Sequence, residues 1–456
     1  MSIINKSLLN EFNILMGKQW VFLNDKWPEM KPSKYHRTEI KIVSEIDHVK
    51  QVVLEKLGPI PVFFFFLVLF PFKHHPGPYR NVEKGLLILY HILKGGPHSD
   101  MGRFIAQSSF YDIHKSFYGH EQSPNTELDD QVTTRLSKMF STLRIRILSA
   151  KANNPVLFKT VTLLLDGHDT RGTRTGSRSE DGYSYKLKKA GFRTQVCIDV
   201  NGMVIMTSGS LPCKDNSDGV MFTKMGLDNT VQKGDCLAVD GGYTLFIKQV
   251  VEKSDLKERN FCHPIRKLKN VELSDEEKRY NERFGSFRSI IEGFFGELGT
   301  VFEKFNNRRS IRTTDTNIFN LQFRVACLLL NVKKFVELGH IEPYPHHMSW
   351  LENQFDYPSE DTLNFEALRI STLKEKQEDS EKLSKYQAQI LAGSTLDESD
   401  EEMEDTFEVE RILDHKGKGK NKRYLVKWKG YKKTTWQGIE DFDTTQCIDD
   451  YWETRK

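Results

Sequence analysis

The feature that most constrains this chain is a long polar stretch near its C-terminal end. From about residue 358 to residue 405 the side chains are polar and charged, and seven of the nine residues from Asp397 to Asp405 are acidic. Such a segment buries too little apolar surface to offset the entropy lost on folding, so we expect residues 346–405 to form a charged, solvated linker. The chain should therefore fold as separate domains on either side of it.

The rest of the chain has the composition of a globular protein. Of its 456 residues, 38% are hydrophobic and 28% are charged, and Lys plus Arg exceed Asp plus Glu by three. With so small a net charge, contacts with nucleic acid must come from local basic patches.

The six cysteines form no C-x-x-C pair and have no histidine at finger-like spacing. This pattern argues against disulfides and against a zinc site, and it favours a reduced, intracellular environment. The N-terminus shows no secretory signal pattern.

One segment, residues 62–70, is uninterrupted apolar between two prolines. At nine residues it is shorter than the about 20 apolar residues that a membrane-spanning helix needs. We therefore expect it to be buried core, and we expect no membrane partner.

Residues 1–153 are predicted to be helical. Apolar side chains at helical spacing predict a helix over 82–93, which the glycines and proline at 95–97 end. Ser99 is expected to cap a second short helix to residue 106, and a third should run to residue 117 after a break at Ser108 and Ser109. Three short helices are typical of a helix-turn-helix DNA-binding module, although any small helical bundle gives the same pattern. A further amphipathic helix is predicted over 129–150.

Residues 154–345 change to strands followed by helices. The run 161–165 (VTLLL) predicts a buried strand that ends at Asp166-Gly167, and 236–239 predicts another that ends at Asp240. Between them, Asn201-Gly202 joins two alternating segments and predicts a β-hairpin. A helix is predicted to open at Ser274 with a capping box and to continue through Glu292. This order predicts an α/β or α+β domain.

Three carboxylates in this region are candidates for chemistry. Asp166 and Asp240 follow strands, where α/β sheets commonly place functional residues, but an Asp-Gly pair after a strand is also ordinary turn chemistry. Glu292 lies in an apolar part of its helix, where a buried glutamate would need a partner or a metal. Carboxylates converging without cysteine or histidine suit Mg²⁺ or Mn²⁺, and two such ions about 4 Å apart can promote attack on a phosphodiester.

The middle region resembles the DDE superfamily transposases of the PIF/Harbinger type over about residues 161–333. The motifs that carry the resemblance are LLLDGHD at Asp166, QVCIDVNGMV at Gln195, SDGVMF at Asp218, AVDGGY at Asp240 and RSIIEGFFGELGTVFEKF from Arg288. The resemblance implies an RNase H-like sheet with Asp166, Asp240 and Glu292 as the catalytic, metal-binding triad. It also implies a structural role for Asp218, an orienting or phosphate-binding role for Arg288, and DNA binding by the helical N-terminal region.

A basic stretch lies between the first predicted strand and Gln195. It includes three arginines that are candidate DNA contacts, Arg171, Arg174 and Arg178. Such residues can track phosphates, with an affinity that falls as salt rises. A solvated basic loop would look the same in sequence.

The last segment, residues 406–456, predicts a small β-sheet followed by a C-terminal helix. The run FEVERILDHKGKGKNKRYLVKWKGYKKTTWQGIEDF begins at Phe407, and TQCIDDYWE closes it. It resembles the chromodomain family, which implies that Phe407, Trp428 and Tyr431 form an aromatic cage around a methylated lysine, with Trp436 in the core. A trimethylammonium donates no hydrogen bond, but desolvated aromatic faces attract its charge. The segment 408–410 would pair with a histone tail by strand addition. Ordinary core packing of these aromatics is the alternative.

Together these features predict a multidomain, transposase-derived nuclear protein. We expect a helical DNA-binding region (1–153), an RNase H-like DDE nuclease domain that uses Mg²⁺ or Mn²⁺ (154–345), the linker (346–405) and a chromodomain (406–456). The expected partners are DNA and a methylated histone tail, and the oligomeric state is left open, a homo-oligomer included. The alternative is a domesticated, non-catalytic chromatin-binding protein that keeps the DDE fold as a DNA-binding scaffold.

Overall fold

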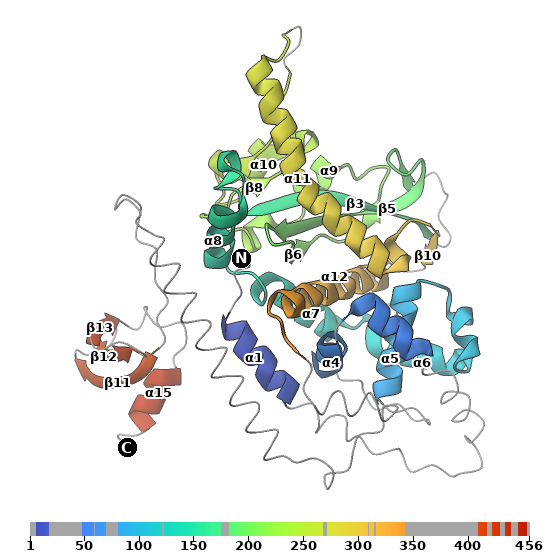
Figure 1. The fold of residues 1–456 in the computed structure, drawn as a ribbon, viewed down its shortest axis with the longest axis horizontal. Helices are drawn as coiled ribbons and strands as arrows, with labels where there is room; N and C mark the ends of the chain where they lie inside the picture. Colours follow the sequence, from blue (N-terminus) through green and yellow to red (C-terminus); the bar gives the residue numbers. More distant parts are fainter. Residues whose placement is uncertain are drawn as a thin grey trace. The chain divides into compact units, whose positions relative to one another are not determined.

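The structure is a computed structural model in which the chain divides into two compact units, Met1–Phe365 and Glu366–Lys456 (Figure 1). It describes residues 6–17, 48–58, 60–69, 81–120, 123–174, 182–267, 271–308, 310–313 and 316–342 of the first unit, and 409–416, 422–428, 434–438 and 446–453 of the second. The predicted linker therefore lies outside the described residues.

A mixed sheet forms the middle of the first unit (Figure 1). Its main path runs through β4 (Tyr183–Ser184), β5 (Lys189–Asp199), β3 (Leu163–Arg174), β8 (Leu237–Ala238) and β9 (Phe261–Cys262). Strands β3 and β5 are antiparallel, whereas β8 is parallel to β3 and β9 is parallel to β8. Three further strands join this path: β6 (Val204–Thr207) and β7 (Leu211–Pro212) pair with β5, and β10 (Ile311–Thr313) pairs with β3.

The β5–β6 hairpin is confirmed at Asn201-Gly202. Gly202 has φ of 78°, a left-handed conformation that glycine adopts without strain. The Asp199 carboxylate accepts the backbone N–H groups of Asn201 and Met203, each at 2.9 Å. The turn is therefore held by a buried side chain as well as by its own sequence.

Strand β3 is longer than predicted, because it continues past Asp166 to Arg174. Its backbone stays paired with β5 as far as Arg171, which faces Gly191. The residues after Asp166 are polar yet buried, and Asp169 is satisfied by Ser184 and by both ends of the Arg193 guanidinium. The apolar run at 161–165 therefore predicted only the first part of β3. The rest of the strand consists of polar residues that can be buried because they are hydrogen-bonded.

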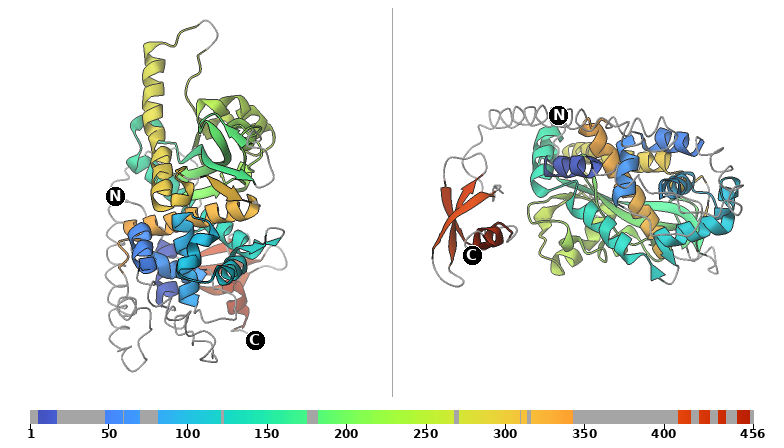
Figure 2. Two further views of the ribbon diagram at one scale, coloured as in Figure 1. Left: turned by 90° about the vertical axis from the view of Figure 1, so that its right-hand side faces the viewer. Right: turned by 90° about the horizontal axis from the view of Figure 1, so that it is seen from below.

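Two long helices pack with the sheet. Helix α11 (Asp275–Val301) begins at the predicted Ser274, with Ser274 and Glu277 forming the capping box, and its N-terminal part projects past the sheet (Figure 2). Helix α12 (Thr316–Leu338), which was not predicted, is buried on most of its surface. A helix that is apolar nearly all round lacks the amphipathic period by which a surface helix is recognised.

The N-terminal helices share one hydrophobic core with the sheet, α11 and α12. They include α1 (Lys6–Gly17), α4 (Ile60–Leu69), α5 (Asn81–Lys94), η1 (His98–Arg103), α6 (Gln107–Tyr118) and α7 (Thr126–Lys138). Helix α8 (Leu143–Asn153) follows α7 and contributes no residue to this core. The prediction that the apolar segment at 62–70 is core is confirmed for its described side chains, because α4 buries Val62, Phe65 and Phe66 completely or nearly so. In the described part of the chain, no helix has the length and apolar character needed to cross a membrane.

Helix boundaries in this region differ from the prediction at three places. The 3-10 helix η1 begins at His98 with Pro97 as its N-cap, so Ser99 is not a cap. Helix α6 contains Ser108 and Ser109, and the break precedes it. The helix predicted over 129–150 is two helices, because Thr142 caps α8 and Ser141 turns away to donate a 2.7 Å hydrogen bond to Asp199.

The second unit is the predicted small sheet with a C-terminal helix. Strands β11 (Val409–Lys416), β12 (Arg423–Trp428) and β13 (Thr434–Gly438) are antiparallel, and α15 (Gln446–Glu453) follows. The core consists of Ile412, Tyr424, Val426, Ile448 and Tyr451. Trp436 is not part of it, contrary to expectation: it is half-buried, and the Lys416 ammonium lies 4.2 Å from its ring centre.

Candidate active site

The register of β3 against β8 sets two of the predicted carboxylates level with each other. Leu164 pairs with Ala238 in parallel, so two residues further along each chain Asp166 and Asp240 stand at equivalent positions. Asp240 follows the end of β8 and caps η5 (Gly241–Phe246), accepting the Gly241 N–H. Asp166 likewise accepts the N–H of Gly167 at 2.8 Å. Each aspartate therefore accepts the N–H of the glycine that follows it and still has a second oxygen for other partners, although Asp166-Gly167 lies within β3 and forms no turn.

Arg288 of α11 joins these two aspartates. Its Nη2 lies 2.9 Å from Asp166 Oδ2, and its Nη1 lies 3.5 Å from Asp240 Oδ2. The arginine is buried, and its Nε has no hydrogen-bond partner in the structure. One guanidinium thus places a positive charge between two carboxylates that come from different strands.

The two aspartates differ in their surroundings. The Asp166 side chain is 18% exposed and that of Asp240 is 55% exposed. Burial raises the pKa of Asp166 above its ordinary value, and the charge on Arg288, the Gly167 N–H and Lys186 oppose that rise. Asp166 is therefore the carboxylate that gains most from a nearby cation.

Glu292 does not have the buried position predicted for it. It lies one turn beyond Arg288 on α11, but it is exposed, because Ile291, Phe294 and Leu298 form the buried face of the helix. Among the described residues, only one set of three potential ligands has its donor atoms all within 4.8 Å of one another, and it consists of histidines elsewhere in the unit. The structure thus brings Asp166 and Asp240 together under Arg288 and leaves Glu292 outside that contact.

A network beside the aspartates was not predicted from the sequence. Gln195 donates to Asp218 at 2.8 Å and accepts the hydroxyl of Tyr243, while Arg193 lies 3.3 Å from Asp218 Oδ2. Asp218 is therefore held by two neighbours, as a structural residue would be. The set combines Arg193 and Gln195 of β5 with Asp218 and Tyr243 from two other segments of the chain, so no local pattern could have revealed it.

The basic stretch is only partly described. Arg171 is half-buried in β3, and its backbone N–H donates to Asn307 at 2.6 Å. The side chain of Arg174 and the whole of Arg178 lie outside the described residues, so their predicted contact with DNA stays a prediction. Arg193 of the same stretch is bound to Asp169 and serves the fold.

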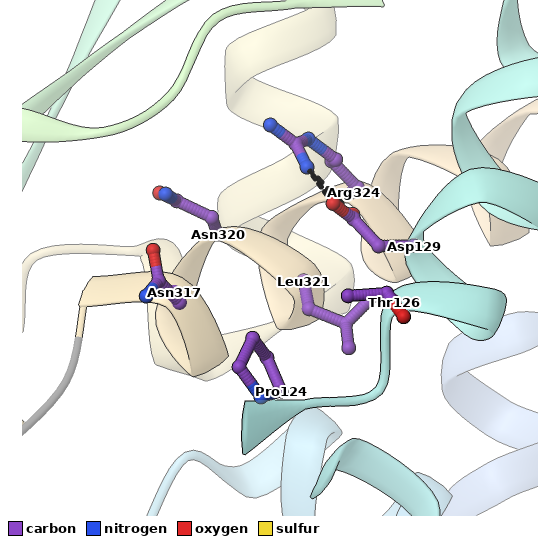
Figure 3. A pocket seen from close by; sticks show the side chains of 7 residues that line it. All are labelled: Pro124, Thr126, Asp129, Asn317, Asn320, Leu321 and Arg324. Atoms are coloured by element: carbon purple, nitrogen blue, oxygen red, sulfur yellow. Dashed lines mark hydrogen bonds and ion pairs between the residues drawn. The ribbon is translucent and has the colours of Figure 1, made fainter. Parts of the chain in front are cut away.

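A small polar pocket lies apart from the aspartates, with a volume of about 170 Å³ (Figure 3). Its walls come from β2 (Ser123–Pro124), α7 and α12, and Arg324 bonds Asp129 there with both distances at 2.6 Å. None of the predicted site residues lines it. It offers an ion pair, amide groups and the Thr126 hydroxyl.

In the second unit, two of the predicted cage residues, Phe407 and Tyr431, lie outside the described residues. The backbone of Trp428 pairs with Val409 at the end of β12, and its side chain is not described. Strand β11 lies at one edge of the three-stranded sheet in the described residues, so its outer side is the edge at which a further strand would add.

Comparison with known proteins gives two family matches. Residues 165–331 match the family model of the DDE superfamily endonucleases, and residues 407–454 match the Chromo (CHRromatin Organisation MOdifier) domain. The chain is 42% identical over 62 residues to the chromatin-associated protein SWI6 of Cryptococcus neoformans var. grubii, an alignment that covers 13% of this chain and 28% of that protein. No solved structure matches the chain. On these grounds the chain carries a DDE superfamily endonuclease domain within its first unit and a chromodomain at its C-terminal end.

Proposed function

We propose that the first unit is a metal-dependent DNA nuclease and strand-transfer enzyme of the PIF/Harbinger transposase type. The observation that carries this proposal is the parallel register that sets Asp166 level with Asp240 under one arginine. Paired carboxylates at the ends of adjacent parallel strands are a common place for chemistry in such sheets. The family match over residues 165–331 supports it.

The order of strands supports an RNase H-like sheet. Three antiparallel strands, β6, β5 and β3, are followed by the parallel strands β8 and β9. Asp166 lies in the first strand of this set along the chain, and Asp240 lies two residues beyond the end of the fourth. The adjacent strands β3 and β8 therefore position both aspartates.

The donor set fits a hard divalent cation. Asp166 and Asp240 offer carboxylate oxygens, which Mg²⁺ and Mn²⁺ prefer, and Glu292 is the proposed third ligand. When bound, such an ion would activate the attacking oxygen and stabilise the leaving oxygen of a phosphodiester. Asp166 must be ionised to bind it, and the charge on Arg288 helps to keep it so. Arg288 would also be close enough to contact a phosphate of the DNA substrate.

For the C-terminal unit we propose binding of a methylated histone tail. Phe407, Trp428 and Tyr431 would surround the methylated ammonium, and the outer edge of β11 would pair with the peptide backbone. This activity would hold the nuclease at chromatin and implies a nuclear protein with DNA and histones as partners.

A second function is favoured by one specific observation. Arg288 already offsets the charge of both aspartates, and Glu292 is exposed and outside their contact. A domesticated protein that uses the DDE fold as a DNA-binding scaffold would tolerate this arrangement, since it needs no metal.

Nicking of supercoiled plasmid DNA by the full chain separates the two functions. With Mg²⁺ or Mn²⁺ the wild-type protein should nick the plasmid, Asp240→Ala should not, and Asp255→Ala, an exposed aspartate away from the site, should behave as wild type. Equal nicking by wild type and Asp240→Ala would rule out the proposed site. DNA binding without nicking by any of the three proteins would establish the scaffold instead.

A further inference from the structure

Three histidines face one another in the N-terminal helices, away from the aspartates. His91 lies in α5, His98 in η1 and His114 in α6. Their ring centres are 5.0 Å apart for His91 and His98, 5.6 Å for His91 and His114, and 4.5 Å for His98 and His114. One ring nitrogen from each lies within 4.8 Å of those of the other two. Three successive helical segments thus direct imidazoles to one point.

One of these nitrogens is buried and has no partner. His91 is 4% exposed, and its Nε2 has no hydrogen bond in the structure. A buried polar atom left without a partner costs about 1–3 kcal/mol, and in native proteins it commonly marks a site for water or an ion. A backbone hydrogen bond at Gly96 opposes the lowering of the His91 pKa. The unpartnered Nε2 of His91 is thus the ring nitrogen that can serve as a metal ligand.

The surroundings favour neutral imidazoles. Burial, and after it nearby positive charges, lowers the pKa of His91 and of His114 well below the ordinary value, and burial also lowers that of His98. Neutral imidazole is the form that binds metals. The Gln322 amide nitrogen lies 3.1 Å from His114 Nε2 and donates to it, so a metal bound at this nitrogen would take the place of that hydrogen bond.

We propose that His91, His98 and His114 bind a divalent transition-metal ion of the zinc class. Three imidazole nitrogens suit Zn²⁺ and do not suit Mg²⁺, which prefers oxygen. Three protein ligands leave a fourth position for water or another donor. The ion would tie α5, η1 and α6 together, and it is chemically distinct from the hard cation proposed at Asp166. Cysteine spacing, the basis of the sequence argument against zinc, carries no information about such a site.

Lys304 provides a means of testing the electrostatics. Its ammonium is hydrogen-bonded to Gln322, burial lowers its pKa to about 8, and its charge disfavours a second cation beside the histidines. Lys304→Met should therefore bind zinc more tightly than the wild-type chain.

The experiment is zinc titration of the chelator-stripped full chain by calorimetry, with thermal unfolding as a second readout. Wild type should bind one Zn²⁺ that Mg²⁺ does not displace, and its melting temperature should rise with zinc. His98→Ala, which changes the most exposed of the three, should lose this binding at least tenfold, whereas His263→Ala, an exposed histidine elsewhere, should keep it. Circular dichroism would verify that each variant is folded.

The proposal is overturned if wild type and Lys304→Met both fail to bind zinc, or if His98→Ala binds it as wild type does. In either case the three rings are packing residues. The assay measures binding only, so its result is independent of whether the aspartate site cleaves DNA.

Discussion

Arg288 of α11 binds Asp166 of β3 with Nη2 and Oδ2 at 2.9 Å, although the two residues lie 122 positions apart in the chain. The contact fixes the long helix to the strand that carries the most buried carboxylate of the proposed site. A cation bound at Asp166 would therefore act on the same carboxylate as the charge on the arginine. Several properties of the site depend on this competition.

Removing the charge of Arg288 should strengthen metal binding. In Arg288→Gln, affinity for Mn²⁺ at about pH 8, where aspartates are ionised, should rise several-fold, because a positive charge within about 4 Å opposes a second cation. Calorimetric titration would measure it. Arg283→Gln, an exposed position on the same helix, is the control. An unchanged affinity in Arg288→Gln would show that the arginine and the metal do not share Asp166.

The buried ion pair between Arg146 and Asp235 should be the most costly one to break. Its two hydrogen bonds are 2.8 and 2.6 Å long, and the side chains are 3% and 0% exposed. Asp235→Ala leaves a buried, unpaired guanidinium, which should lower the free energy of unfolding by about 3–5 kcal/mol. Urea denaturation measures it. The control, Asp275→Ala, breaks an exposed pair with Lys278 and should lower the free energy of unfolding by under about 1 kcal/mol. Similar losses of stability in both variants would contradict the expectation.

The turn aspartate, Asp199, should make stability depend on pH. Burial raises its folded-state pKa, and hydrogen bonds from Ser141, Met203 and Asn201 and the charge on Arg146 only partly offset this. Between the unfolded and the raised folded pKa the folded state holds more protons, so the free energy of unfolding should fall as pH rises through that window, by at most about 1.4 kcal/mol per pH unit. Asp199→Asn keeps an oxygen for the turn and should lack this decline. Equal pH slopes in denaturant titrations of the two proteins would refute the assignment.

Gly95 should tolerate no side chain. It ends α5 with φ of 64°, and a Cβ there would lie 2.5 Å from the Lys304 Cα. Gly95→Ala should therefore cost about 2–4 kcal/mol, from the left-handed conformation and from overpacking. Gly102→Ala, whose Cβ would meet nothing within 4 Å, is the matched control for the same urea experiment. A loss in Gly95→Ala no larger than that of the control would mean that η7 (Glu303–Phe305) moves aside freely.

Trp428→Ala should strongly weaken binding of a trimethyl-lysine histone peptide to the C-terminal unit. Loss of one aromatic face of a cage removes roughly 2 kcal/mol, which is about thirtyfold in affinity. Fluorescence anisotropy with methylated and unmethylated peptides would measure it. Tight binding of both peptides by the variant would assign these aromatics to the core.

Local signals in the sequence predicted the elements that local chemistry forms. The Asn201-Gly202 turn, the Ser274 capping box and the apolar segment of α4 all appear where expected, because each depends on residues within a few positions of one another. The small sheet and helix at the C-terminus were predicted for the same reason.

Features that depend on distant residues were missed. β3 continues through His168 and Asp169 because Arg193 satisfies the latter, and nothing near Asp169 in the sequence indicates this. Glu292 was placed inside because four apolar neighbours surround it, but helical geometry turns it outward. The bridge from Arg288 to two strands likewise needs the fold before it can be recognised.

The common hydrophobic core of the first unit limits where the chain can be truncated. Leu8 and Phe12 of α1 belong to the same buried cluster as Phe335 of α12, and the rings of Phe12 and Phe335 lie 5.7 Å apart. A fragment starting at residue 154 would expose a broad hydrophobic surface and should aggregate instead of folding. Expression fragments intended for crystallisation should therefore begin upstream of α1 and extend beyond α12.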